Sequence, residues 1–159
     1  MKVSELQNIF IEELKGYLPE WKFIKSQRHF KKSKEDAVWF FHIGCINHSD
    51  DFDAVGNVAV EFKAGIERIC IVGAELGNIE GTGQNRFPVS SCAEAKSSAA
   101  GLYQYFEVHG LSFLRKYSNT VEVVNTLKQG DKEAMLISPF LNQHQDQINR
   151  LCSHYDISM

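Results

Sequence analysis

An apolar run at residues 37–46, AVWFFHIGCI, restricts the possible folds of this chain more than any other feature. Its aromatic and β-branched side chains favour a β-strand. A strand that is apolar on both faces belongs in the middle of a sheet. We therefore expect a central strand here, covered either on both faces or on one face with an aromatic-rich rim on the other.

Further strand patterns flank this run. Residues 57–64 alternate apolar and polar side chains, and residues 66–72 form another apolar segment. Residues 21–32 mix aromatic and charged side chains in the loose alternation of a half-exposed strand, and a turn at residues 34–36 follows. The connections are too short for helical crossovers, so we expect a mostly antiparallel sheet of about four to five strands within residues 21–75.

Helical patterns precede and follow the predicted sheet. Apolar residues recur at helical spacing from Ser4 to Leu18, Ser4 and Gln7 resemble a capping box, and Pro19 ends the segment. After an irregular loop at residues 77–88, C-terminal helices are predicted over about residues 91–156. The expected borders are a capping box at Ser91 and Glu94, a helix end near Gly110, a short helix at 111–117, a Thr120 cap for 121–128, a stop at Gly130, and a last helix that starts at Ser138-Pro139. Five residues of this last helix are expected to point inward: Phe140, Leu141, Ile148, Leu151 and Cys152.

The order of helix, strands and helices predicts one α+β domain over residues 1–159. The net charge is only −3, although residues 1–40 carry eight Lys and Arg against six acids and the remainder carries nine against fourteen. A small net charge gives weak long-range steering and disfavours nucleic-acid binding by bulk electrostatics. We therefore do not expect nucleic acid as the main partner.

The expected location is the cytoplasm. Residues 3–18 alternate acids with apolar residues, unlike the apolar core of a secretory signal. The longest apolar stretches are too short to cross a bilayer, so no membrane association is expected. The cysteines are far apart and fit free thiols in a reducing compartment: Cys45, Cys70, Cys92 and Cys152.

Two segments, WKFIKSQRHFKK and GLSFLRKYSNTVEVVNTL, resemble a bacterial family catalogued as domain of unknown function 4304. The second segment, Gly110 to Leu127, is similar to that family's Gly-apolar-x-Phe-Leu-x-x-Tyr-Ser turn into a helix. The resemblance covers Leu6 to Leu127, leaves the tail from Lys132 unexplained, and implies no catalytic residues. Proteins of this size and build also resemble bacterial immunity proteins, which neutralise contact-delivered toxins.

The densest set of potential metal ligands is His42, Cys45 and His48 beside three aspartates. Residues 42 and 45 are an odd number of positions apart, so on a strand their side chains point to opposite faces. The stretch from Asp51 begins like a calcium loop but lacks the ligands that the loop requires at its fifth and twelfth positions. We expect no metal and no cofactor.

Two features leave an enzyme or small-molecule domain open as an alternative. Gly81-Thr82-Gly83 precedes a predicted helix but completes no phosphate-binding motif. Cys92 lies in the first turn of that helix, which favours a reactive thiolate, but a nucleophile also needs a base. We assign no catalytic residue.

A basic and aromatic strand offers a second alternative, an RNA-binding module. Its cations interleave with Trp21, Phe23, His29 and Phe30, and such a surface binds single strands by stacking and backbone attraction. Lysines on an edge strand also prevent aggregation, which is the favoured interpretation. The cations are Lys22, Lys25, Arg28, Lys31, Lys32 and Lys34.

The leading hypothesis is a non-catalytic binding protein, an immunity-type inhibitor of a bacterial toxin. Two predicted loops that follow strands carry acids, and at one end of the sheet they would form an acidic rim against a basic partner. The candidate partner-binding residues are Asp50, Asp51, Asp53, Glu75 and Glu80.

Overall fold

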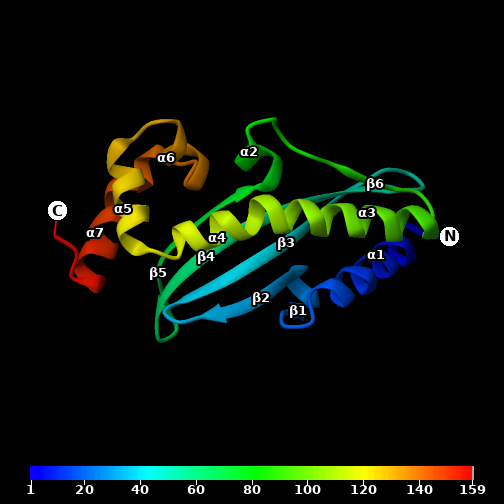
Figure 1. Ribbon diagram of the computed structural model, residues 1–159, viewed down its shortest axis with the longest axis horizontal. Helices are drawn as coiled ribbons and strands as arrows, with labels where there is room; N and C mark the ends of the chain where they lie inside the picture. Colours follow the sequence, from blue (N-terminus) through cyan, green and yellow to red (C-terminus); the bar gives the residue numbers. More distant parts are fainter. Residues whose placement is uncertain (159) are drawn as a thin grey trace.

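The computed structural model describes residues 1–158 and confirms the α+β class (Figure 1). An N-terminal helix is followed by an antiparallel sheet and a series of C-terminal helices. The strands are β1 Lys22–Ile24, β2 His29–Lys34, β3 Ala37–Asn47, β4 Phe52–Ala64, β5 Glu67–Glu75 and β6 Phe87–Val89. The helices are α1 Val3–Tyr17, α2 Leu76–Glu80, α3 Cys92–Tyr105, α4 Leu111–Tyr117, α5 Thr120–Gln129, α6 Lys132–Ile137 and α7 His144–Tyr155, with single turns η1 Lys25–Gln27, η2 Phe106–Gly110 and η3 Leu141–Gln143.

All strand pairs in the sheet are antiparallel, and the order is β1-β2-β3-β4-β5. The long strand β4 has two partners on the same side. Its residues 57–64 pair with β5, and its residues 52–54 pair with the short strand β6. The predicted strand at 21–32 is in fact two strands, because η1 and a left-handed Arg28 interrupt it.

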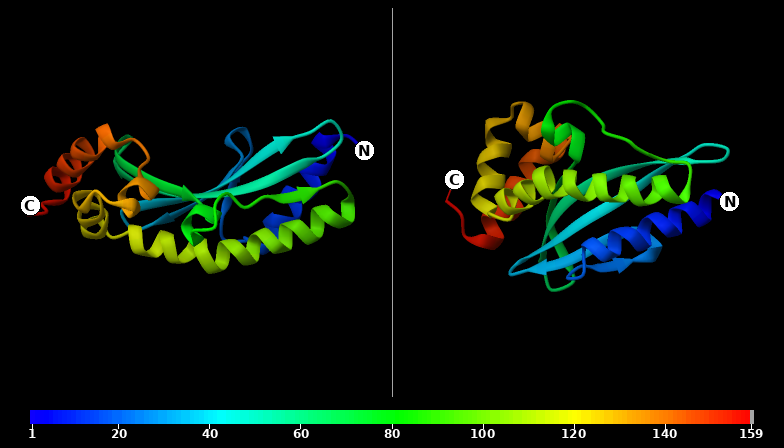
Figure 2. Two further views of the ribbon diagram at one scale, coloured as in Figure 1. Left: turned by 90° about the horizontal axis from the view of Figure 1, so that it is seen from above. Right: turned by 45° about the vertical axis from the view of Figure 1, so that its right-hand side comes forward.

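The two faces of the sheet have different surroundings. Trp39, Phe41 and Ile43 of β3 point to the inner face and are buried in the core, which α1, α3 and α4 cover. Phe40 and His42 point to the outer face and are only half-buried. Figure 2 shows α3 and α4 on one side of the sheet and the η1 turn projecting on the other. The central strand is therefore covered on one face and partly exposed on the other, the second of the two expected arrangements.

A π-helical turn joins two helices that the sequence predicts as separate. Residues 106–110 continue from α3 directly into α4, and Gly110 has a right-handed helical φ of −73°. The predicted helix end at Gly110 is therefore wrong. A Cβ at this position would lie 2.6 Å from a ring carbon of Phe106, so close packing and not a change of chain direction requires the glycine.

Two of the three predicted N-caps are also wrong. Helix α1 begins at Val3 after Lys2, and no side chain caps it. Asn119, not Thr120, caps α5, because its Oδ1 accepts hydrogen bonds from the amides of Val121 and Glu122. The Ser91 cap of α3 is confirmed, since its Oγ accepts from the Glu94 amide at 3.1 Å.

The loop and the last helix differ from the prediction as well. Residues 77–88 are not wholly irregular, since they include most of α2 and the first residues of β6. The last helix begins at His144, and the predicted inward residues Phe140 and Leu141 are 62% and 65% exposed. The chain is extended at Ser138 and Phe140, so the helical spacing that predicted these residues inward does not apply there. Ile148 and Leu151 lie in α7 and are buried as predicted, and the buried His144 donates from Nε2 to the Ser138 carbonyl at 2.7 Å.

We predict that Gly77→Ala destabilises the protein by about 2–3 kcal/mol. A Cβ at Gly77 would lie 1.9 Å from the Gly83 carbonyl oxygen and 2.6 Å from the Asn85 amide nitrogen, and these backbone atoms cannot move aside cheaply. Gly16→Ala in α1 is the control, because nothing lies within 4 Å of its Cβ position and alanine favours a helix. Thermal unfolding should show a lower Tm for the first variant only; equal Tm values would contradict the packing described here.

Candidate functional site

The three aspartates of the expected acidic rim lie at the β3–β4 hairpin. Asp50 and Asp51 occupy its tip, and Asp53 is the second residue of β4, opposite Pro88 of β6. Asp53 also lies 3.2 Å from His48 Nε2 and 3.8 Å from Arg86, so part of its charge is compensated within the protein.

Glu75 is part of the fold and not of the surface. It is 8% exposed, and its carboxylate accepts hydrogen bonds from three backbone amides, those of Gly77, Asn78 and Asn85. Glu80 lies at the end of α2, where its carboxylate is 2.8 Å from His109 Nε2. A hydrogen bond from the Thr82 hydroxyl and the nearby His109 lower the pKa of Glu80.

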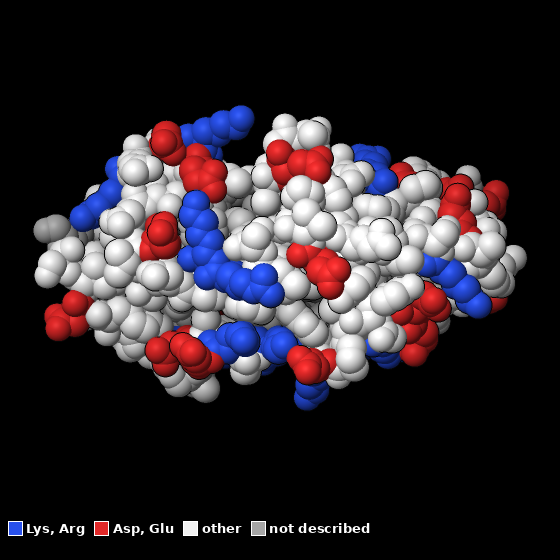
Figure 3. Space-filling model, in the orientation of Figure 1, with Lys and Arg blue, Asp and Glu red and all other residues white. Residues whose placement is uncertain are grey.

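The two acidic loops do not meet. Glu75 is opposite Asn57 in the β4–β5 ladder, and Asp51 lies six residues before Asn57 along the same strand. At about 3.4 Å per residue, Asp51 therefore lies roughly 20 Å along the strand from the position opposite Glu75. On the side shown in Figure 3, Asp and Glu side chains lie interspersed with Lys and Arg. The expected joint acidic rim is therefore absent from the arrangement of residues 1–158, because the hairpin extends well beyond the end of β5.

The other sequence candidates remain separate. His42 lies on the outer face of β3, whereas Cys45 packs against the core, and no group of three or more metal-binding side chains exists in residues 1–158. The sulfur of Cys92 is exposed and lies 3.8 Å from the Met1 sulfur. No histidine is hydrogen-bonded to it in the part of the chain that the structure describes. Within residues 1–158, no helix has the length and apolarity needed to span a membrane.

The basic strand divides between the two faces of the sheet. Lys31 shares the outer face with His29, whereas Lys32 and Lys34 point to the helix-covered side. There the Lys32 ammonium lies 5.9 Å from the Trp21 ring centre and the Lys34 ammonium lies 5.2 Å from that of Trp39. The cations that the sequence groups together therefore serve two different surfaces.

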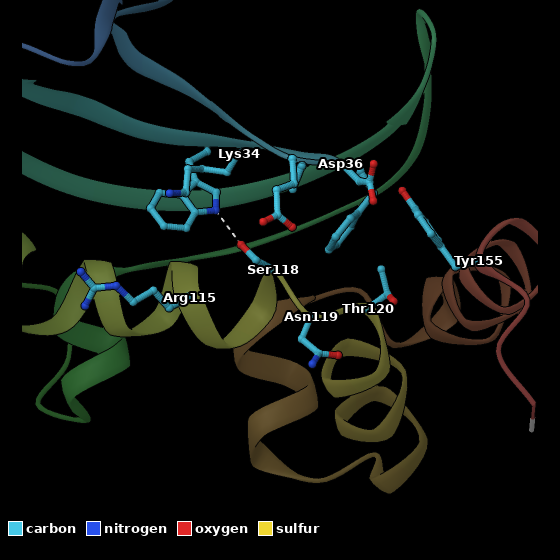
Figure 4. Close-up of a pocket in the computed structure, with 11 residues that line it drawn as sticks. Lys34, Asp36, Arg115, Ser118, Asn119, Thr120 and Tyr155 are labelled. Carbon is cyan, nitrogen blue, oxygen red and sulfur yellow. Dashed lines mark hydrogen bonds between the residues drawn. The ribbon is translucent and has the colours of Figure 1, made fainter.

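A concavity of about 410 Å³ lies beside Lys34, between the β2–β3 turn and the start of α5 (Figure 4). The Trp39 indole donates to Ser118 Oγ at 2.6 Å, and this hydroxyl donates to the Leu114 carbonyl. These polar groups are thus used within the fold. The Tyr155 hydroxyl is enclosed and has no hydrogen-bond partner among residues 1–158, and burial together with the Asp36 charge raises its pKa.

The outer face holds a larger depression, of about 540 Å³. Directly across the strands, Lys31 pairs with Phe40, Phe40 with Ala59, and Ala59 with Gly73. Ala59 and Gly73 are small and leave room beside the Phe40 ring. The lining residues are Ile24, Gln27, His29, Lys31, Phe40, His42, Ala59, Glu61, Lys63, Arg68 and Ile71.

Aromatic and charged groups are combined in this depression. The His29 ring lies 4.6 Å from the Phe40 ring, centre to centre, on the neighbouring strand. Three cations, Lys31, Lys63 and Arg68, line the depression together with a single carboxylate, that of Glu61. Glu61 is 7% exposed, and Arg68 Nε donates to its Oε2 at 2.6 Å. The depression is therefore locally basic although the whole chain is acidic.

Both histidines in the depression favour the neutral form. Burial lowers the pKa of His29, and the Lys31 charge lowers it further. Burial also lowers the pKa of His42, which is directly opposite His29 in the ladder, so the two rings repel one another's charge. Each ring gains its charge only at acidic pH.

Sequence reasoning identified His29 and Lys31 in this depression but missed Phe40, Glu61, Lys63 and Arg68 as members of one site. The available signal was the two-residue period of β2, β3 and β4, which places alternate residues on the outer face. The cross-strand register that brings these residues together cannot be predicted from the sequence of one strand.

Comparisons with family models, curated proteins and solved structures found no match to this chain. The resemblance of the segment Gly110 to Leu127 to family 4304 stays a prediction, and the site is interpreted from its own geometry.

We predict that Glu75→Ala lowers the free energy of unfolding by about 2–4 kcal/mol, because three backbone amides lose a charged acceptor. Glu67→Ala in the same strand is the control; its side chain is exposed, and the change should stay within about 0.5 kcal/mol. Denaturant unfolding measures both. Equal stability of the two variants would return Glu75 to the list of candidate partner-binding residues.

Proposed function

We propose that this protein binds single-stranded nucleic acid on the outer face of its sheet. The observation that carries the proposal is the depression in which the His29 and Phe40 rings lie beside Lys31, Lys63 and Arg68. Every base has a flat face that stacks on an aromatic ring, and the cations attract the phosphates that connect the bases. A sheet surface with these two features suits a flexible strand better than a rigid duplex.

The local charge, not the net charge, supports this function. Lys31 and Lys63 form no ion pair within residues 1–158 and remain available to phosphates. Lys22 and Lys25 lie on β1 and η1, next to the depression. Binding by such a small number of cations should be moderate in affinity and sensitive to salt.

The toxin-inhibitor hypothesis has less support, because it depends on a joint acidic surface. Glu75 is engaged with backbone amides, and roughly 20 Å separate the remaining acids at the hairpin from α2. In the present proposal the chain is still a non-catalytic binding protein, but the binding surface is the outer face of the sheet and the partner is negatively charged, not basic.

Fluorescence anisotropy with labelled oligonucleotides of mixed sequence, about ten nucleotides long, tests the proposal. With three phosphate contacts, raising salt from about 50 to about 200 mM should weaken binding about 20-fold. Phe40→Ala should remove stacking worth about 1–3 kcal/mol. Phe140→Ala is the matched control, because Phe140 is an exposed aromatic residue outside the depression.

Two results would contradict the proposal. One is an affinity that does not respond to salt. The other is an equal loss of binding in the Phe40 and Phe140 variants, because the affinity would then not depend on the outer face.

Affinity should also rise as the pH falls. The pKa values of His29 and His42 lie below the ordinary value of 6.5, so both rings are neutral near pH 7. A bound phosphate favours the protonated rings, and we expect roughly threefold to tenfold tighter binding at about pH 5.5 than at about pH 7.5. In the double variant His29→Gln and His42→Gln this dependence should disappear. Retention of the full pH response in the double variant would assign it to other groups.

A further inference from the structure

The buried carboxylate of Glu61 is the unusual group in the outer depression. Its neighbours on the floor are apolar or small: Ala59 lies two residues earlier on β4, and Val38 and Ile71 are directly opposite on the flanking strands. The side chain of Glu61 is 9% exposed, so its charge has lost most of its contact with water. A carboxylate in such surroundings is costly unless hydrogen-bond donors surround it.

Only one half of this carboxylate has a donor. Arg68 Nε donates to Oε2 at 2.6 Å. Oε1 accepts no hydrogen bond from any residue in the range 1–158 and is not fully enclosed, so it opens toward the depression. Lys31 and Lys63 line the same depression without pairing with Glu61. A ligand in the depression would therefore encounter one unfilled acceptor beside the Phe40 ring.

The edges of the bases differ in what they offer to an acceptor. Cytosine and adenine carry an exocyclic amino group, which donates, where thymine and uracil carry a carbonyl oxygen, which accepts. A carboxylate oxygen attracts the first group and repels the second. Discrimination is strong when a wrong ligand leaves a buried polar group unpaired.

We propose that Glu61 makes the outer face selective for amino-bearing bases, cytosine above all, over uracil. This inference rests on the proposed function, because it assigns a preference to the same site. In this arrangement a base stacks on Phe40 above Ala59 and directs its amino group toward Oε1 of Glu61. Lys31 lies on β2 and Lys63 on β4, and both line the outer depression along which the connecting phosphates would run.

The test compares oligocytidylate with oligouridylate of about ten nucleotides. The two pyrimidines are alike in size, so stacking contributes little to the difference. Wild-type protein should bind the cytosine strand at least about fivefold more tightly, the lower end of what one good base contact contributes. Glu61→Gln places an amide, both donor and acceptor, at the same position, and the ratio of the two affinities should fall to about one.

Glu67→Gln is the matched control, since it removes the same charge from an exposed carboxylate that pairs with Arg150. It should leave the cytosine-to-uracil ratio unchanged. Because Glu61→Gln also removes a negative charge from the depression, the uracil strand should bind the variant more tightly, and the ratio, not the affinity, is the deciding quantity. A melting curve of each variant verifies that it folds.

The possible outcomes are distinct. Tight, salt-dependent binding of both strands with equal affinity would overturn the base preference and leave nucleic-acid binding in place. Absence of binding to either strand would overturn the proposed function and this inference with it. A cytosine preference that survives Glu61→Gln would assign the selectivity to another residue and overturn the role of Glu61.

Discussion

The burial of one face of the sheet is the constraint on which the rest of the structure depends. Trp39, Phe41 and Ile43 on β3 and Val58 and Val60 on β4 form a continuous apolar surface that the helices remove from water. Because the side chains of a strand alternate, fixing these residues inward also fixes Phe40, His42, Ala59 and Glu61 outward. The proposed binding surface is thus a geometrical consequence of the core, and a one-residue slip of β3 or β4 would destroy both.

Charge has two separate uses in this molecule. Glu75 stabilises the chain reversal after β5 by holding amides from both sides of the following loop. Glu61 accepts a hydrogen bond from Arg68 at Oε2 only, and its Oε1 opens toward the outer depression. Three protein donors on Glu75 and one on Glu61 distinguish a carboxylate engaged by the fold from the carboxylate of the proposed site.

The fold class was predictable because its signals are local. Alternation in residues 57–64, the apolar run at 37–46 and short connections are sufficient for an antiparallel sheet, and each was confirmed. The helix borders were less predictable, because a glycine or a proline does not by itself end or start a helix: Gly110 stays helical and packs on Phe106, and Phe140 after Pro139 is extended and exposed. The candidate site depends on cross-strand register, which has no local signal. The acids at the β3–β4 hairpin and those after β5 were therefore predicted to be neighbours, although the hairpin extends far past the end of β5.

The outer edge of β5 is covered by side chains of α7, which is synthesised much later than the sheet. Arg150 donates to the Ile69 carbonyl across 81 residues, and Gln147 reaches the Ile71 carbonyl across 76. These two side chains of α7 occupy acceptors that would otherwise be free to pair with a strand of another molecule. During synthesis the sheet is therefore complete long before its edge is closed. The interval in which this chain is most prone to aggregate on the ribosome ends only when α7 emerges and docks.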